Sequence, residues 1–316
     1  MSKIAFVFPG QGAQTVGMGK ALHDAFPEAR AVFEAADEAL SENLSRLCFE
    51  GPEAELRLTA NTQPAILTVS LAAHAVASRR LPPPAFVAGH SLGEFSALAA
   101  VGAIPLRDAV RVVRERGRLM QEAVPEGQGA MSAVLGLAPE LVAQACREAE
   151  SELEASGARV QPANYNEPAQ TVISGHAAAV SKAGDRALVL GAKKVIPLSV
   201  SAPFHSSLMA PVQEPLRARL ATVSFRAPTA PVITNVEATP NADPARIAGL
   251  LVAQVTAPVR WVETIQQLQL LGVDRTVELG PGRVLSGLIK RIDRTATLFH
   301  VEDPASLEKT EAGLRA

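Results

Sequence analysis

Residues 85–101 constrain the fold of this chain more than any other stretch. A short apolar run, Ala85–Ala88, is followed by GHSLG and then by a helical pattern over about 94–101. A strand, a tight turn and a helix in this order form the context that raises a nucleophilic serine above a sheet. Gly89 and Gly93 suit this turn because they lack the Cβ atoms that clash where backbones approach closely. Since the pentapeptide alone is common, a turn serine without chemistry remains the alternative.

Short apolar runs alternate with helical patterns along most of the chain. We expect strands at Ile4–Phe8, Val232–Asn235 and Thr276–Leu279, and helices near Met18–Ala25, Ala29–Leu40, Gln63–Arg79 and 284–292. This alternation predicts an α/β fold with a mainly parallel sheet. The charged tail after about Asp303 is expected to be frayed.

The middle of the chain has a different order of elements. Its patterns predict strand, helix, strand, strand, helix and strand, which is the βαββαβ order of a ferredoxin-like unit. These elements are expected at 130–137, 139–150, 159–165, 170–174, 177–190 and 193–198. We therefore expect a small subdomain, residues 129–198, inserted into a large α/β subdomain formed by 1–128 and 199–316.

Composition and charge argue against several classes of protein. The net charge is −2 and basic residues are interspersed with acidic ones, unlike the basic segments of nucleic-acid-binding chains. The longest apolar stretches, Ala65–Ala77 and Ala97–Leu106, are too short or too interrupted to span a membrane. The run Ile4–Phe8 is too short for a signal peptide. The widely separated Cys48 and Cys146 fit a reducing cytoplasm and indicate no metal site.

A serine nucleophile needs a base, and histidine performs this role best near neutral pH. His205 is the candidate, because it lies in a proline-containing loop, APFHSS, where the chain should return to the large subdomain. His90 is a poor candidate for the base, because it adjoins Ser91 and successive side chains of an extended backbone point apart. The N–H of Leu92 would be a free donor beside the serine Oγ, because this residue opens a helix. For His205, a loop histidine without a role remains the alternative.

Arg116 lies on the apolar face of a helix predicted over 106–121. Its neighbours three and four residues away are all apolar, namely Val112, Val113, Leu119 and Met120. A buried guanidinium without an anionic partner is very unfavourable, and no acidic residue of this helix reaches that face. Three interpretations remain open: an ion pair with a distant internal acid, a stem that extends to solvent, and bidentate binding of a substrate carboxylate.

Five short motifs follow one another along almost the whole chain: PGQGAQ, GHSLGE, RG-x-x-MQ beginning at Arg116, APFHSS and GPG-x-VL. Together they resemble the malonyl-CoA:acyl carrier protein transacylases over roughly residues 3–300. The resemblance implies a hydrolase-like large subdomain with an inserted ferredoxin-like subdomain. It also implies transfer of a malonyl group from malonyl-CoA to the phosphopantetheine thiol of acyl carrier protein. Such transfer is a ping-pong reaction through a malonyl-serine ester and serves fatty acid or polyketide synthesis.

The resemblance also implies roles for individual residues. Ser91 would carry the acyl group and His205 would be its base. The N–H groups of Gln11 and Leu92 would stabilise the oxyanion, and Arg116 would bind the malonyl carboxylate.

Further implications concern the surroundings of the site. The main-chain carbonyl of Gln254 would orient the histidine, and Phe204 matches the malonyl-selecting form of its motif. No metal and no redox cofactor are implied, and we expect a cytoplasmic monomer. Because acyl carrier proteins are acidic, a few basic residues are candidates for docking, although an ordinary solvated surface is the favoured interpretation. These residues are Lys193, Lys194, Lys290 and Arg291.

Two rival functions share parts of this pattern. An esterase or thioesterase of the α/β type has the same elbow, but its histidine normally lies late in the chain. Arg116 would also have no task in an enzyme for neutral acyl chains. A non-catalytic adaptor with this fold does not need Ser91, His205 and Arg116 together.

Overall fold

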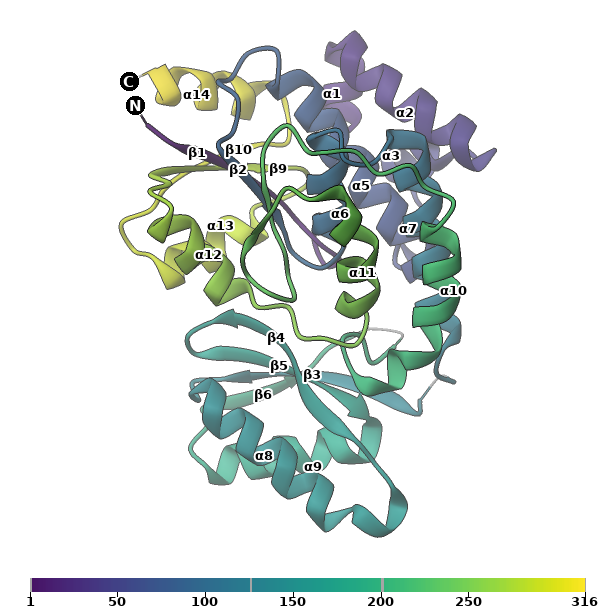
Figure 1. Cartoon of the computed structure of the whole chain (residues 1–316), viewed down its shortest axis with the longest axis vertical. Coiled ribbons are helices and arrows are strands. Elements are labelled where there is room, and N and C mark those ends of the chain that lie inside the picture. Colours follow the sequence, from purple (N-terminus) through teal and green to yellow (C-terminus); the bar gives the residue numbers. More distant parts are fainter. Residues whose placement is uncertain (1, 126, 200–201, 316) are drawn as a thin grey trace.

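The computed structural model describes residues 2–125, 127–199 and 202–315. Their strands form two separate sheets, one with six strands and one with four (Figure 1). The six-stranded sheet lies in the upper part of Figure 1, and the four-stranded sheet lies below it. The predicted α/β class, with a mainly parallel sheet and a second unit, is confirmed.

The larger sheet is mainly parallel. Its strands are β1 (Ile4–Phe8), β2 (Phe86–Gly89), β7 (Val232–Ile233), β8 (Pro240–Asn241), β9 (Arg275–Leu279) and β10 (Thr297–Val301). They lie in the order β10-β9-β1-β2-β7-β8, and β8 joins the edge antiparallel to β7. The sequence patterns predicted β1, β2, β7 and β9, whereas β8 and β10 were not predicted.

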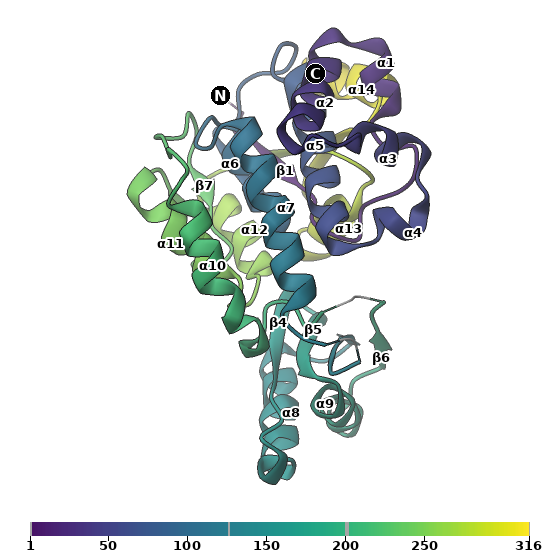
Figure 2. The ribbon, with the colours of Figure 1, turned by 90° about the vertical axis from the view of Figure 1, so that its right-hand side faces the viewer.

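Helices cover both faces of this sheet (Figure 2). Successive residues of a strand point to opposite faces, so Phe6 and Phe8 enter one core while Ala5 and Val7 enter another. The first core includes residues of helices between residues 27 and 122, and the second includes residues of two helices between residues 261 and 292. Burial on both faces explains why β1 is an uninterrupted apolar run.

The helices around this sheet come from both ends of the chain. The N-terminal ones are α1 (Lys20–Ala25), α2 (Pro27–Leu40), α3 (Leu44–Glu50), α4 (Glu53–Leu56), α5 (Thr59–Ala77), α6 (Leu92–Ala100) and α7 (Leu106–Glu122). The C-terminal ones are α10 (Ala210–Leu220), α11 (Pro244–Gln254), α12 (Trp261–Leu270), α13 (Val284–Ile292) and α14 (Pro304–Arg315). The short helices α3 and α4 were not predicted, because their apolar residues are too few to establish a period.

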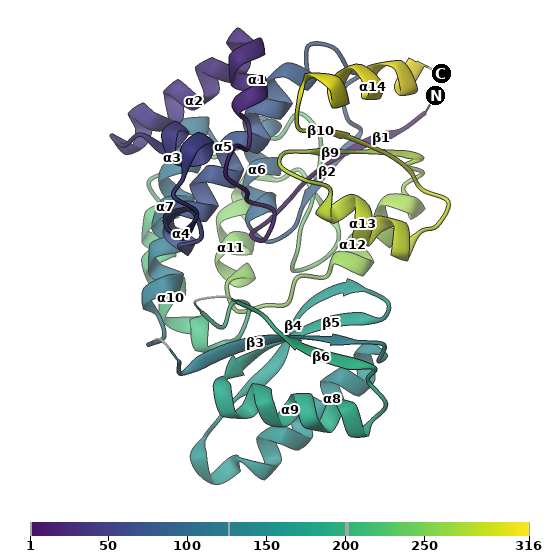
Figure 3. The same cartoon turned by 180° about the vertical axis from the view of Figure 1, so that it is seen from behind.

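The smaller sheet is built from consecutive residues of the middle of the chain. Its strands are β3 (Gly129–Leu135), β4 (Val160–Glu167), β5 (Gln170–His176) and β6 (Lys194–Pro197). They are antiparallel in the order β4-β5-β3-β6, and α8 (Pro139–Glu152) and α9 (Ala177–Val189) pack on one face (Figure 3). The predicted βαββαβ order is present.

The smaller unit has a core of its own, formed by buried residues of α8, α9 and three of its strands, with the partly buried Val195 of β6 packed against it. This separation supports our proposed division of the chain into 1–128 with 199–316 and 129–198. Residues 200 and 201, beside the second boundary, lie outside the described residues.

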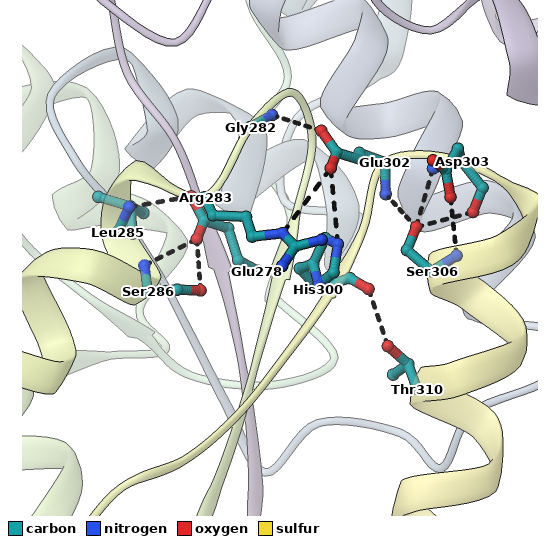
Figure 4. A network of polar contacts seen from close by, with 10 residues as sticks. All are labelled: Glu278, Gly282, Arg283, Leu285, Ser286, His300, Glu302, Asp303, Ser306 and Thr310. Carbon is teal, nitrogen blue, oxygen red and sulfur yellow. Dashed lines mark hydrogen bonds and ion pairs between the residues drawn. The ribbon is translucent and has the colours of Figure 1, made fainter. Parts of the chain in front are cut away.

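The chain does not fray after Asp303, contrary to the prediction from its charge. Residues Pro304–Arg315 form α14, whose inner face packs on β10. The Asp303 side chain accepts a hydrogen bond from the Ser306 N–H at 2.7 Å, and the Thr310 hydroxyl donates to the carbonyl of His300 (Figure 4). A capping aspartate followed by proline is a helix start that the sequence contains. The prediction missed this helix start because the charged residues of the segment suggested a frayed tail.

Candidate active site

Ser91 lies in the turn between β2 and α6, so the strand, turn and helix are arranged as predicted. Its φ is 52°, a positive value that residues other than glycine rarely adopt. A Cβ atom on Gly89 would lie 1.9 Å from the carbonyl of Gly93, and one on Gly93 would lie 2.0 Å from the Phe8 oxygen. Both glycines are therefore required by the close approach of three backbone segments.

His205 approaches Ser91 from the loop between β6 and α10. Its Nε2 lies 2.7 Å from the Ser91 Oγ, and its Nδ1 lies 2.9 Å from the Gln254 carbonyl oxygen and 3.1 Å from that of Ala257. Because a carbonyl can only accept, Nδ1 carries the proton and Nε2 accepts the serine hydroxyl. Two main-chain carbonyls thus take the place of the carboxylate that orients the histidine ring in a full triad.

Both histidines near the serine are neutral at physiological pH. Burial and the positive charge of Arg116 lower the pKa of His205 to about 3. Burial also lowers the pKa of His90, whose Nε2 lies 2.8 Å from the Asn166 Oδ1. Only the neutral form of His205 can accept a proton, so this environment keeps it in the form that a base requires.

Arg116 is buried in α7, with 1% of its surface exposed. Its Nη1 donates to the Gln63 Oε1 at 2.6 Å, and its Nη2 donates to the Gln254 Oε1 at 3.0 Å. The same Nη2 lies 3.3 Å from the Ser91 Oγ, and the Nε has no partner among the described residues. No carboxylate of the described chain forms an ion pair with this guanidinium, and its stem does not reach solvent. A direct ion pair and a stem that extends to solvent are thereby excluded, although the charge of the buried Glu94 acts on Arg116 without an ion pair.

Gln254 contacts the site through its main chain and its side chain. Its carbonyl accepts from His205, as the sequence resemblance implied. Its side-chain Nε2 donates to the Glu94 Oε2 at 2.7 Å and to the Ser91 carbonyl at 3.1 Å. The side-chain oxygen accepts from Arg116. One glutamine therefore connects the histidine, the serine, the arginine and a buried glutamate.

Sequence reasoning assigned no role to Asn235, which is fully buried after β7. Its Oδ1 accepts the Ser91 N–H at 2.7 Å, and its Nδ2 donates to the Gly89 carbonyl at 2.6 Å. The side chain thus stabilises the strained turn from 144 residues away. A polar residue at the carboxyl end of a predicted strand was the one signal that could have indicated it. Gln63 and Glu94 were also missed as parts of the site.

These groups surround a cavity of about 170 Å³ between the two units. Its wall includes all the predicted site residues except Gln254, together with residues of the smaller sheet. They are Gln11, Gln63, His90, Ser91, Leu92, Arg116, Met120, Met131, Asn164, Asn166, Val172, Leu198, Phe204 and His205. The main-chain N–H groups of Gln11 and Leu92 make no hydrogen bond to another residue of the described chain. They are therefore available to a ligand oxygen.

The four candidate docking residues lie on two elements. Lys290 and Arg291 lie at the end of α13, where Arg291 pairs with Glu167 at 3.1 Å. Lys193 and Lys194 are exposed beside β6 and form no ion pair with the described chain. Lys290 is exposed as well and also forms no ion pair with the described chain, so Arg291 alone of the four candidates is paired with an acidic residue of that part of the chain.

The described residues contain no group of three histidine, cysteine or acidic side chains arranged to hold a metal ion. None of their helices is both long enough and apolar enough to cross a membrane.

Comparison with known proteins identifies the family. Residues 5–296 match the sequence model of the acyl transferase domain. The chain belongs to the acyl transferase domain family. A malonyl CoA-acyl carrier protein transacylase of Bacillus subtilis is 47% identical over 308 residues, which cover 98% of this chain and 96% of the relative.

Solved structures of acyltransferases agree over the same length. An acyl carrier protein S-malonyltransferase of Vibrio cholerae superposes with a TM-score of 0.94 at 44% identity, covering 98% of this chain and all of that one. A malonyl-transacylase in complex with a type II PKS acyl-carrier protein superposes with a TM-score of 0.95 at 43% identity, covering 99% and 100%. The resemblance to malonyl-CoA:acyl carrier protein transacylases that the five motifs indicated is confirmed.

Proposed function

We propose that this acyltransferase moves a malonyl group from malonyl-CoA to the phosphopantetheine thiol of acyl carrier protein, as an extender unit for fatty acid or polyketide synthesis. The observation that carries the proposal is the position of Arg116. Its guanidinium is buried, lacks an ion pair with the described chain and lies 3.3 Å from the Ser91 Oγ. An acyl group that ends in a carboxylate supplies the missing anion.

In the first half-reaction the Ser91 oxygen attacks the thioester carbonyl of malonyl-CoA. His205 takes the serine proton on Nε2, which lies 2.7 Å from the Oγ. The negative oxygen that develops is stabilised by the N–H groups of Gln11 and Leu92. The tetrahedral intermediate then expels CoA, which leaves as a thiol with the proton from His205, and a malonyl-serine ester remains.

The second half-reaction repeats these steps with a different thiol. The phosphopantetheine thiol of acyl carrier protein gives its proton to His205 and attacks the ester carbonyl. The same two N–H groups stabilise the second oxyanion, and Ser91 leaves with the proton. The carbonyl of Gln254 keeps the imidazole in one tautomer and stabilises its protonated form in both half-reactions.

Other parts of the proposal concern specificity and partners. Phe204 lines the cavity and is proposed to favour malonyl over bulkier α-substituted groups. Lys193, Lys194 and Lys290 are better candidates for docking of the carrier protein than Arg291, because no acidic residue of the described chain pairs with them. We further propose that the enzyme acts as a cytoplasmic monomer. The mechanism draws all its proton transfers and charge stabilisation from the residues above, and it includes no metal or redox cofactor.

A transfer assay tests this function. The protein is mixed with malonyl-CoA and phosphopantetheinylated acyl carrier protein, and the mass of the carrier is followed with time. The expected product is malonyl-carrier protein, formed by the wild type and not by Ser91→Ala. Release of free malonate without malonyl-carrier protein would instead identify a hydrolase.

A further inference from the structure

Glu94 is a buried carboxylate for which the mechanism above has no use. It lies in the first turn of α6 with 2% of its surface exposed. Its Oε2 accepts hydrogen bonds from the Asn235 N–H at 3.1 Å and from the Gln254 Nε2 at 2.7 Å. No lysine or arginine of the described chain forms an ion pair with it. Since burying a carboxylate in this way is unfavourable, its presence calls for a reason.

Glu94 determines which way the Gln254 amide points. A carboxylate can only accept, so the amide turns its Nε2 toward Glu94 and its Oε1 away. That oxygen is the one that accepts from the Arg116 Nη2 at 3.0 Å. The carboxylate therefore sets the geometry of the guanidinium through one intervening side chain.

Glu94 also carries a negative charge that opposes the positive charge of Arg116. The other titratable groups around the two are His205 and His90, and both are neutral near pH 7 because their pKa values are lowered. Burial raises the pKa of Glu94 to about 7, against the influence of Gln254, Asn235 and Arg116. The two charges therefore cancel above about pH 7, and the pair becomes net positive as Glu94 is protonated below it.

We propose that Glu94 is a positioning residue whose negative charge weakens the hold of Arg116 on the acyl carboxylate. This inference rests on the proposed function. A carboxylate that enters beside Arg116 is attracted by the guanidinium and repelled by Glu94. Without this opposing charge, Arg116 would bind the malonyl carboxylate more tightly. Transfer of the malonyl group to the acceptor thiol and its release from the site would then slow each turnover.

Glu94→Gln isolates the charge. Both hydrogen bonds to Glu94 end on the same oxygen, so the oxygen of a glutamine amide can accept both while the charge is removed. Dissociation constants for malonyl-CoA and acetyl-CoA are measured by calorimetry in a Ser91→Ala background, which prevents ester formation. At pH about 8.5, where Glu94 is ionised, we expect Glu94→Gln to tighten malonyl-CoA binding by about tenfold, the low end of what a neighbouring charge does to an ionised group. Acetyl-CoA binding should change by less than about twofold, because this acyl group has no charge.

A pH series provides a readout that a merely structural role would not change. In the parent with Glu94, the preference for malonyl-CoA should increase as the pH falls from about 8.5 to about 6, because protonation of Glu94 mimics the substitution. The malonyl carboxylate stays ionised over this range. In the Glu94→Gln variant the preference should be constant. If that variant does not fold, the pH series of the parent alone decides the question.

Glu278→Gln is the matched control. Glu278 is also a buried carboxylate with a raised pKa, and it accepts hydrogen bonds from the main chain of Leu285 and Ser286 and from the Ser286 hydroxyl (Figure 4). It does not line the cavity. We expect this substitution to leave the preference for malonyl-CoA unchanged.

Three results would overturn the inference. They are equal effects of Glu94→Gln on both ligands, an equal change of preference in Glu278→Gln, and a parent preference that is independent of pH. In each case the parent still prefers malonyl-CoA, so the proposed function stands. A parent that binds both ligands equally at every pH would overturn the proposed function and this inference with it.

Discussion

Replacing Arg116 by alanine tests whether its guanidinium recognises a carboxylate on the acyl group. The Nη2 lies 3.3 Å from the Ser91 Oγ, so an acyl group esterified there has its far end beside the guanidinium. A hydrogen bond to a charged group contributes about 1.5–3 kcal/mol, and about 1.4 kcal/mol corresponds to a factor of ten. Arg116→Ala should therefore lower kcat/KM for malonyl-CoA by about 10- to 150-fold, and much less for acetyl-CoA.

The assay is single-turnover acylation of the protein, followed by the rate at which each acyl group adds to its mass. Arg118→Ala is the matched control, because Arg118 lies on the same helix but is exposed and paired with Glu115 and Glu122. Thermal unfolding of both variants shows whether either loses folded protein. Equal losses of rate with the two substrates, in a folded Arg116→Ala variant, would refute the role of this side chain.

Asn235→Ala removes two buried hydrogen bonds from the Ser91 turn, so we expect the free energy of unfolding in urea to fall by about 2–4 kcal/mol. Gly93→Ala places a Cβ 2.0 Å from the Phe8 oxygen and should yield little folded protein by circular dichroism. Burial lowers the pKa of His74 from 6.5 to about 4, so the unfolded chain binds a proton that the folded chain rejects. Stability should therefore fall as the pH decreases from about 6.5 to about 4, and His74→Phe should reduce that fall in urea midpoints.

Local pattern was enough to predict most of the fold. The uninterrupted apolar run of β1 and the βαββαβ order of the middle segment are properties of consecutive residues, and both could be read directly. The edge strands β8 and β10 could not. β8 has two residues, and β10 is only half-buried, so neither shows the burial pattern of a central strand. The helix α14 was missed because its charges outweighed a readable cap at Asp303.

The site was predictable where one residue broke a local rule. Ser91 is flanked by glycines, and Arg116 is charged on an apolar helix face. The contacts that brace these residues join segments more than a hundred positions apart, as between Asn235 and Ser91 or Gln254 and Glu94. No period or spacing records such contacts, because they depend on how the sheet brings β2, β7 and α11 together.

The most direct test of the account is the mass of the intact protein after brief exposure to malonyl-CoA, methylmalonyl-CoA and acetyl-CoA in turn. The account predicts a malonyl adduct that forms fastest, maps to Ser91 in a peptide digest and disappears when acyl carrier protein is added. It also predicts that His205→Ala slows adduct formation, because Nε2 lies 2.7 Å from the attacking oxygen. An adduct on another residue, or an acetyl adduct that forms as fast as the malonyl one, would contradict it.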